Sequence, residues 1–164
     1  MKFLISFFIP FLFAVHGIIM ATDEFWFHRK RNLPKWERWG HPIDTLSFIF
    51  CLSLALTLPG SRGNVVVYSL AALFSLLLIT KDEWVHFRYC TALEMWLHAL
   101  LFLIHPILLA VAGIYLARFE LKLDIEYLRF WILLQTVISI LFFCYQVIYW
   151  NGPWKRSLPT PLQK

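Results

Sequence analysis

ALEMWLHALLFLIHPILLAVAGIYLA, residues 92–117, is the longest of five apolar stretches in this chain. About 20 apolar residues suffice to cross a hydrocarbon core of roughly 30 Å, so this stretch predicts a transmembrane helix. Glu94, His98 and His105 follow one another at spacings of four and seven, and they therefore share one face of that helix. Ionisable groups inside a membrane are costly unless they have partners, so the same stretch predicts a buried polar site.

Four further apolar segments complete the expected architecture: residues 2–22, 42–59, 64–80 and 127–150. A chain with 60% hydrophobic, 18% aromatic and only 15% charged residues is not a soluble domain. We therefore predict an all-α, polytopic membrane protein with five transmembrane helices in one domain, residues 1–164. With their polar ends included, the helices are expected at residues 2–28, 34–59, 64–88, 91–117 and 127–150. Residues 151–164, with three prolines, are expected to form an extended cytoplasmic tail.

Basic residues are unequally divided between the two sides of this topology. One side carries ten of them: Arg29, Lys30, Arg31, Lys35, Arg38, Lys81, Arg88, Lys155, Arg156 and Lys164. The other side carries five: Lys2, Arg62, Arg118, Lys122 and Arg129. The positive-inside rule then predicts a bacterial-type inner-membrane protein with its N-terminus outside and its C-terminus in the cytoplasm. The net charge of +5 is explained by topology and anionic lipid, and no basic stripe for nucleic acid is present.

Acids and histidines gather at the four helix ends that this topology places on the cytoplasmic side. The predicted metal ligands are His16, Asp23, Glu24, His41, Asp44, Asp82, Glu83, His86, Glu94, His98 and His105. Helical periodicity does not decide between Asp23 and Glu24, or between the adjacent acids at 82 and 83. Two histidines, at 16 and 105, lie about 10 Å deeper than their partners at 23 and 98, given a rise near 1.5 Å per residue. This depth favours a buried site over a solvated charge patch.

Several polar residues at this level also have ordinary explanations. His28 precedes three basic residues, so its role stays open between a solvated loop residue and a member of the polar cluster. Glu37 and Glu94 fall in first helical turns, where acids act as caps or complement the helix dipole, and Thr91-x-x-Glu94 matches a capping box. Pro34 fits a first helical turn. Five tryptophans are expected to form an interfacial aromatic belt: Trp26, Trp36, Trp39, Trp84 and Trp96.

A weak internal repeat links the polar helix ends. DEFWFH at 23–28 and WERWGH at 36–41 parallel DEWVH at 82–86 and LEMWLH at 93–98. Two hairpins of like orientation would be related by a pseudo-twofold axis along the membrane normal, so helices 1–4 are expected to form a four-helix bundle. The last helix, residues 127–150, carries no acid or histidine and is expected to pack outside that bundle.

This pattern of inward Glu and His residues, with one Glu83-x-x-His86, resembles the di-iron carboxylate proteins built on four-helix bundles. The resemblance covers about the first 110 residues and implies two iron ions. The chain departs from that class in having more histidines and Glu-x-x-x-His spacings on three helices, and it lacks the H-x-x-H-H boxes of membrane desaturases. Mixed nitrogen and oxygen ligands suit iron, manganese or zinc. The three cysteines are dispersed, so neither a disulfide nor a thiolate site is expected.

These observations predict a membrane oxidoreductase with a dinuclear metal centre near the cytoplasmic face. Its expected partners are the lipid bilayer, a lipophilic small-molecule substrate and an electron donor. One alternative is a zinc-dependent lipid hydrolase with Glu24 or Glu83 as the base. Others are a b-type haem protein with His16 and His105 as axial ligands, and a metal transporter or sensor. The transporter is disfavoured because every predicted ligand lies on one side.

Overall fold

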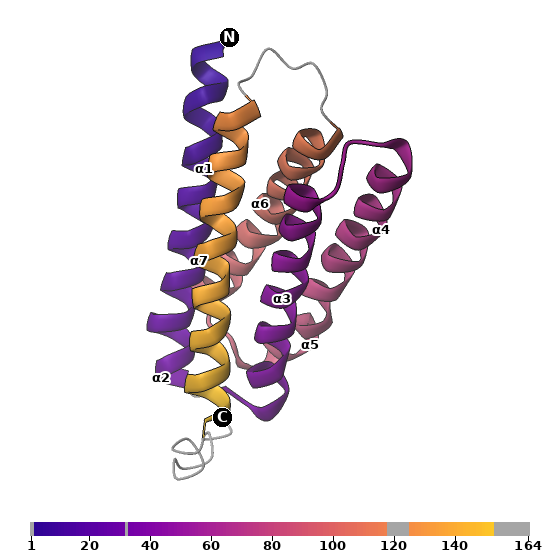
Figure 1. The fold of residues 1–164 in the computed structure, drawn as a ribbon. Coiled ribbons are helices and arrows are strands. Elements are labelled where there is room, and N and C mark those ends of the chain that lie inside the picture. Colours follow the sequence, from indigo (N-terminus) through magenta and orange to yellow (C-terminus); the bar gives the residue numbers. More distant parts are fainter. Residues whose placement is uncertain (1, 32, 118–124, 153–164) are drawn as a thin grey trace.

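The computed structural model describes residues 2–31, 33–117 and 125–152, which form helices joined by short connections. The elements in chain order are α1 (Lys2–Thr22), η1 (Asp23–His28), α2 (Arg29–Arg31), α3 (Lys35–Thr57), α4 (Arg62–Leu78), η2 (Ile79–Asp82), α5 (Glu83–Tyr89), α6 (Ala92–Ala117) and α7 (Ile125–Asn151). The element η1 is a π-helix that continues α1, and η2 is a 3₁₀ turn between α4 and α5. Figure 1 shows α1, α4 and α7 running in one direction and α3 and α6 in the other.

Five helical segments are long and apolar enough to cross a membrane: Phe7–His28, Lys35–Thr57, Arg62–Tyr89, Ala92–Ala117 and Ile125–Asn151. The prediction of an all-helical chain with five such helices is therefore confirmed, and it indicates an integral membrane protein. The expected tail beyond residue 152 lies outside the described residues. Pro34 precedes α3 in an extended conformation rather than lying in its first turn.

The outer surface of the helices is apolar, as lipid contact requires. Leu70, Phe74 and Leu77 on α4 are each more than half exposed. The five tryptophans expected at the interface are exposed as well. They lie near the end of the molecule that carries α2 and α5, where an aromatic belt would meet the headgroups.

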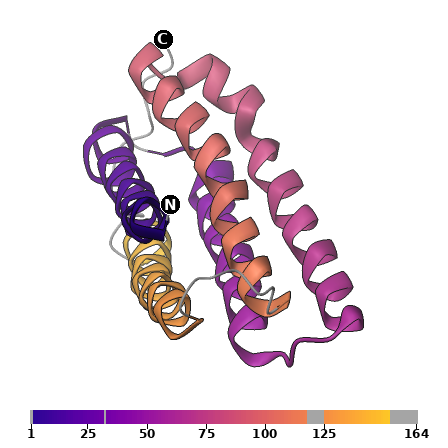
Figure 2. The ribbon, with the colours of Figure 1, turned by 90° about the horizontal axis from the view of Figure 1, so that it is seen from above.

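The sequence led us to expect that the last helix packs outside the other four, and this expectation is wrong. Helix α7 lies along α3 and also contacts α1 and α6 (Figure 2). The inner face of α7 carries neutral polar side chains, including Gln135, Ser139 and Gln146, all of which are buried. A sequence pattern built on acids and histidines does not reveal this face, because its polar side chains are neutral.

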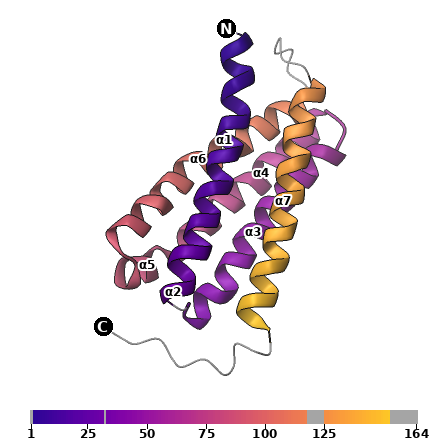
Figure 3. The ribbon, with the colours of Figure 1, turned by 90° about the vertical axis from the view of Figure 1, so that its left-hand side faces the viewer.

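The bundle is divided along its length into an apolar half and a polar half. The apolar core contains Leu12 of α1, Leu52 of α3, Leu108 of α6 and Ile132 of α7. The acids and histidines lie toward the opposite end, where η1, α2 and α5 meet the starts of α3 and α6 (Figure 3). The apolar half holds the helices together, while the polar half is left for a site.

One close approach in the apolar half lets us test the packing. A Cβ atom added at Gly113 would lie 2.9 Å from the Tyr68 ring, whose hydroxyl is held by the Leu109 carbonyl at 2.6 Å. We expect Gly113→Ala to lower the free energy of unfolding by about 1–3 kcal/mol through overpacking. Gly17→Ala is the matched control, because no atom lies within 4 Å of its added Cβ.

The control should be neutral or slightly stabilising, since alanine favours helix over glycine. Thermal unfolding of both variants in the same detergent measures the difference. Equal stability of the two variants would contradict the packing of α4 against α6.

Candidate metal centre

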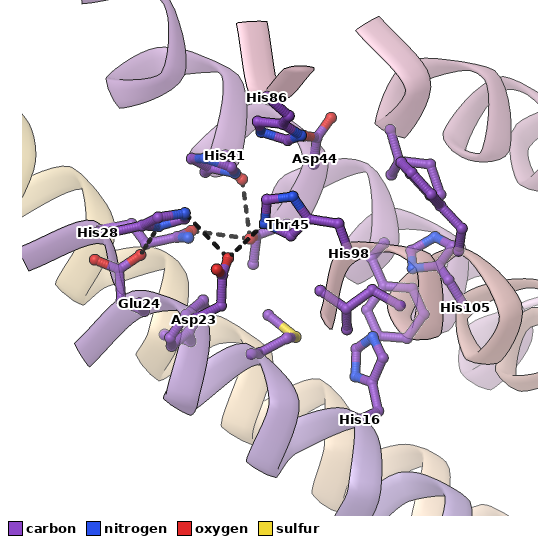
Figure 4. A pocket seen from close by; sticks show the side chains of 17 residues that line it. His16, Asp23, Glu24, His28, His41, Asp44, Thr45, His86, His98 and His105 are labelled. Atoms are coloured by element: carbon purple, nitrogen blue, oxygen red, sulfur yellow. Dashed lines mark hydrogen bonds and ion pairs between the residues drawn. The ribbon is translucent and has the colours of Figure 1, made fainter. Parts of the chain in front are cut away.

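All six histidines of the chain line a single cavity of about 110 Å³ in the polar half of the bundle (Figure 4). Three acids line the same cavity: Asp23, Glu24 and Asp44. The histidines come from α1, η1, α3, α5 and α6, so the fold gathers residues from both halves of the sequence repeat. The rest of the wall includes apolar side chains such as Leu101 and Phe102.

The π-helix η1 determines how the first helix enters this cavity. In an α-helix Asp23 and His28, five residues apart, would face different directions. The π-helix closes i→i+5 hydrogen bonds, and the amide of Arg29 donates to the carbonyl of Glu24 in this way. Asp23 and His28 therefore lie one above the other, and Glu24 faces inward beside them. Periodicity could not choose between Asp23 and Glu24 because both face the cavity.

His28 is at the centre of the site and is buried, so of the two roles left open by the sequence the solvated loop residue is wrong. Its side chain is only 2% exposed. Nε2 of His28 lies 3.1 Å from Oδ2 of Asp23 and 3.7 Å from Oε1 of Glu94, and Nδ1 lies 3.5 Å from Oε2 of Glu24. Three buried carboxylates thus surround one imidazole. The basic residues that follow His28 do not begin a loop, because the helix continues through them as α2.

Helix α6 supplies the opposite wall through Glu94 and His98. Glu94 forms the expected capping box, in which its carboxylate accepts from the Thr91 amide and the Thr91 hydroxyl accepts from the Glu94 amide, both at 3.3 Å. Nε2 of His98 lies 3.0 Å from Oδ2 of Asp23. Ligand atoms of four buried residues lie within 4.8 Å of one another. We call this set, Asp23, His28, Glu94 and His98, the carboxylate cluster.

Two further imidazoles adjoin the carboxylate cluster. The His41 ring stacks on His28 with 4.6 Å between centroids, and the His86 ring lies 4.1 Å from His98. The buried atoms without a hydrogen-bond partner among the residues that the structure describes include Oδ1 of Asp23, Nε2 of His41 and Nδ1 of His98. Each such atom costs about 1–3 kcal/mol if it stays unsatisfied. Unsatisfied oxygen and nitrogen donors that share a cavity are what a metal site requires.

The remaining acids of the predicted set are placed differently. Asp44 lines the cavity, but its Oδ2 is paired with Nζ of Lys81 at 2.6 Å. The Glu83 side chain is 40% exposed and lies outside the cavity lining, with its Oε1 3.3 Å from Nδ1 of His86. It orients that imidazole from behind, as carboxylates do around metal-binding histidines. The side chain of Asp82 lies outside the described residues.

The two deep histidines line the cavity but lie apart from the carboxylate cluster (Figure 4). His16 is hydrogen-bonded to Gln135 at 3.3 Å and His105 to Ser75 at 3.2 Å. Phe48 packs against both rings, with centroid distances of 5.2 and 4.6 Å. Phe48 therefore forms part of the cavity wall beside both deep histidines, and the haem alternative stays a prediction.

Helix α7 also contributes to the site, although it has no acid or histidine in its inner face. The indole N–H of Trp150 donates to Oε1 of Glu24, and the hydroxyl of Thr45 donates to Gln146 at 2.9 Å. Through these contacts α7 holds Glu24 and Thr45 of the cavity lining in place. Sequence reasoning missed Trp150 because an aromatic residue at a helix end first suggests an interfacial anchor.

Cys90 is the second residue that sequence reasoning missed. Its sulfur can approach ligand atoms of His86 and His98 within 4.8 Å. The absence of a Cys-x-x-Cys pair led us to expect no thiolate site. The signal that could have found it is His86-x-x-x-Cys90, because residues four apart share a helical face.

Chemically, the arrangement offers carboxylate oxygens, imidazole nitrogens and one sulfur in and beside a small cavity. Such a donor set suits iron, zinc or manganese. Comparison with protein-family models, with curated proteins and with solved structures finds no match.

The contact between Trp150 and Glu24 gives a test of the site. Trp150→Phe removes a donor to a buried carboxylate, and we expect it to lower the free energy of unfolding by about 2 kcal/mol more than its control. The control is Trp131→Phe, the same change on the same helix at an indole N–H without a hydrogen-bond partner in the described residues. Chemical unfolding in mixed micelles, followed by circular dichroism, compares the two. A Trp131 variant as destabilised as the Trp150 variant would contradict the assignment.

Proposed function

We propose that the chain is a membrane-embedded oxidoreductase that holds two iron ions near the cytoplasmic face and oxidises a lipid or another lipophilic molecule. The observation that carries the proposal is the convergence of all six histidines on one cavity with buried carboxylates. The interior of a membrane protein selects strongly against such groups unless they bind something.

Charge balance supports a bound cation. Asp23 and Glu24 both face His28, and a protonated imidazole would balance only one of these two carboxylates. Burying the remaining negative charge costs several kcal/mol per ion in real proteins. A divalent cation converts these carboxylates and neutral imidazoles from a cost into a ligand shell.

Two metal positions fit the residues present. The carboxylate cluster supplies the first, with two carboxylates and two imidazoles. The second would lie on the side of His86, whose ring is nearly parallel to that of His41 with 6.0 Å between centroids. Asp23 is suited to bridge them, because its Oδ2 faces His28 and His98 while its Oδ1 has no hydrogen-bond partner in the described part of the chain.

Oxidative chemistry on a lipophilic substrate follows from the ligands and the walls. Iron held by carboxylates and imidazoles supplies oxygen activation when it is bound. The apolar wall contributed by Met20, Leu101, Phe102 and Phe142 excludes water and favours a hydrocarbon group beside the cluster. His16 and His105 keep the deep end of the cavity polar through their bonds to Gln135 and Ser75.

The basic face at the same end of the bundle suits an acidic electron donor. Arg29, Lys30 and Arg88 are exposed near the cluster, and Lys30 and Arg88 also lie over the tryptophan rings of the interface. The excess of basic residues on this side supports a cytoplasmic location and an outside N-terminus. A soluble reductase would then reach the centre from the cytoplasm.

Metal analysis of the purified full chain tests the proposal. We expect about two iron ions per chain after expression in iron-replete medium, as in dinuclear carboxylate proteins. A content of less than one equivalent of any transition metal per chain would contradict the proposal. A full complement of zinc without iron would overturn the oxidative chemistry and favour a hydrolase.

Matched substitutions then separate ligands from bystanders. Asp23→Asn keeps the size of the side chain but removes the charge that serves both positions, so we expect metal content to fall by at least half. Asp44→Asn is the control, because the Asp44 carboxylate is already paired with Lys81. This variant should therefore leave the metal content unchanged. Equal metal loss in the two variants would mean that the carboxylate cluster is not the binding site.

A further inference from the structure

The hairpin between α5 and α6 brings a thiol to the edge of the carboxylate cluster. Cys90 follows the last residue of α5, and its amide donates to the His86 carbonyl at 2.9 Å, which continues the helical turn. His86 and Cys90 therefore point to the same side. His98 faces them from the second turn of α6, and ligand atoms of the three residues lie within 4.8 Å of one another.

His98 belongs to both groups of converging ligands. Its ring has two nitrogens, and Nε2 lies 3.0 Å from Asp23 in the carboxylate cluster. Nδ1 is buried and has no hydrogen-bond partner in residues 2–31, 33–117 and 125–152. The ring is 5% exposed and lies 4.1 Å from the His86 ring, on the side away from Asp23. A buried nitrogen beside a second imidazole and a thiol needs a partner.

We propose that His86, Cys90 and His98 bind the second metal ion of the centre through one thiolate and two imidazoles. This inference rests on the proposed function, because it concerns the second position of the same centre. The thiol proton leaves to solvent when the ion binds, so that sulfur coordinates as a thiolate. His98 then links the two positions through its two nitrogens as an imidazolate, and its N–H proton also leaves to solvent when the second ion binds.

The two positions are chemically unequal as a result. The carboxylate cluster offers hard oxygen donors that accept manganese or iron, whereas a thiolate with two imidazoles prefers a softer ion such as zinc, cobalt or ferrous iron. A hard ion is therefore expected to fill one position, and a thiophilic ion to fill both. The exposure of Cys90 is intermediate, which gives an ion a route in from the end of the hairpin.

Cobalt titration of the full chain, after removal of resident metal with a chelator, tests this assignment. Co²⁺ bound to a thiolate gives a strong charge-transfer absorption in the near ultraviolet, which oxygen and nitrogen ligands alone do not give. We expect this band in the wild-type chain with about two Co²⁺ bound, and only about one Mn²⁺ in a parallel titration. Cys90→Ser should abolish the band and lower bound Co²⁺ to about one per chain.

The other cysteines provide the control. Cys51 is buried in the apolar core and Cys144 is exposed on α7, so a double variant with serine at both positions leaves Cys90 as the only thiol. This variant should keep the full band. Co²⁺ binding without a charge-transfer band, or a band that survives in Cys90→Ser, would overturn the thiolate site but leave the metal centre standing. A chain that binds no Co²⁺ or Mn²⁺ would overturn both proposals.

Discussion

The contact of one carboxylate with two imidazoles is the interaction on which the polar half of this protein depends. Oδ2 of Asp23 lies about equally far from Nε2 of His28 and Nε2 of His98, at 3.1 and 3.0 Å. It thereby joins the end of the first helix to α6, across the cavity. A buried carboxylate has lost its hydration, so neighbouring groups must satisfy it with hydrogen bonds or opposite charge. The positions of the surrounding imidazoles follow from this requirement.

Departures from α-helical winding accommodate that contact in both halves of the sequence repeat. The first DE motif is wound as a π-helix over Asp23–His28, and the second ends a 3₁₀ turn over Ile79–Asp82. The π-helix is wound more widely than an α-helix and the 3₁₀ turn more tightly. Corresponding residues of the two motifs therefore face different directions. The two hairpins are therefore alike in sequence but differ in local geometry, which explains why Asp23 of the first motif joins the cluster while Glu83 of the second lies outside the cavity lining.

Hydropathy was sufficient to predict five helices, because a bilayer imposes a length and a composition that no other constraint obscures. Chain order was sufficient to place acids and histidines at one end. The details of the site were not predictable in this way. His28 required knowledge of the π-helix, since α-helical periodicity turns it away from Asp23. Trp150 required distances through space, because it lies in no recognisable motif, whereas Cys90 could have been found from its spacing of four residues to His86.

Helix α7 shows how the cavity keeps its negative charge. This helix serves the site with neutral groups only: Gln135 at His16, Gln146 at Thr45 and the Trp150 indole at Glu24. A neutral donor satisfies a buried carboxylate or imidazole without adding a desolvated charge. A lysine in its place would neutralise the carboxylate and remove the reason to bind a cation, as Lys81 does for Asp44. The absence of acids and histidines from the inner face of α7 is therefore what would suit this helix to the metal centre that we propose.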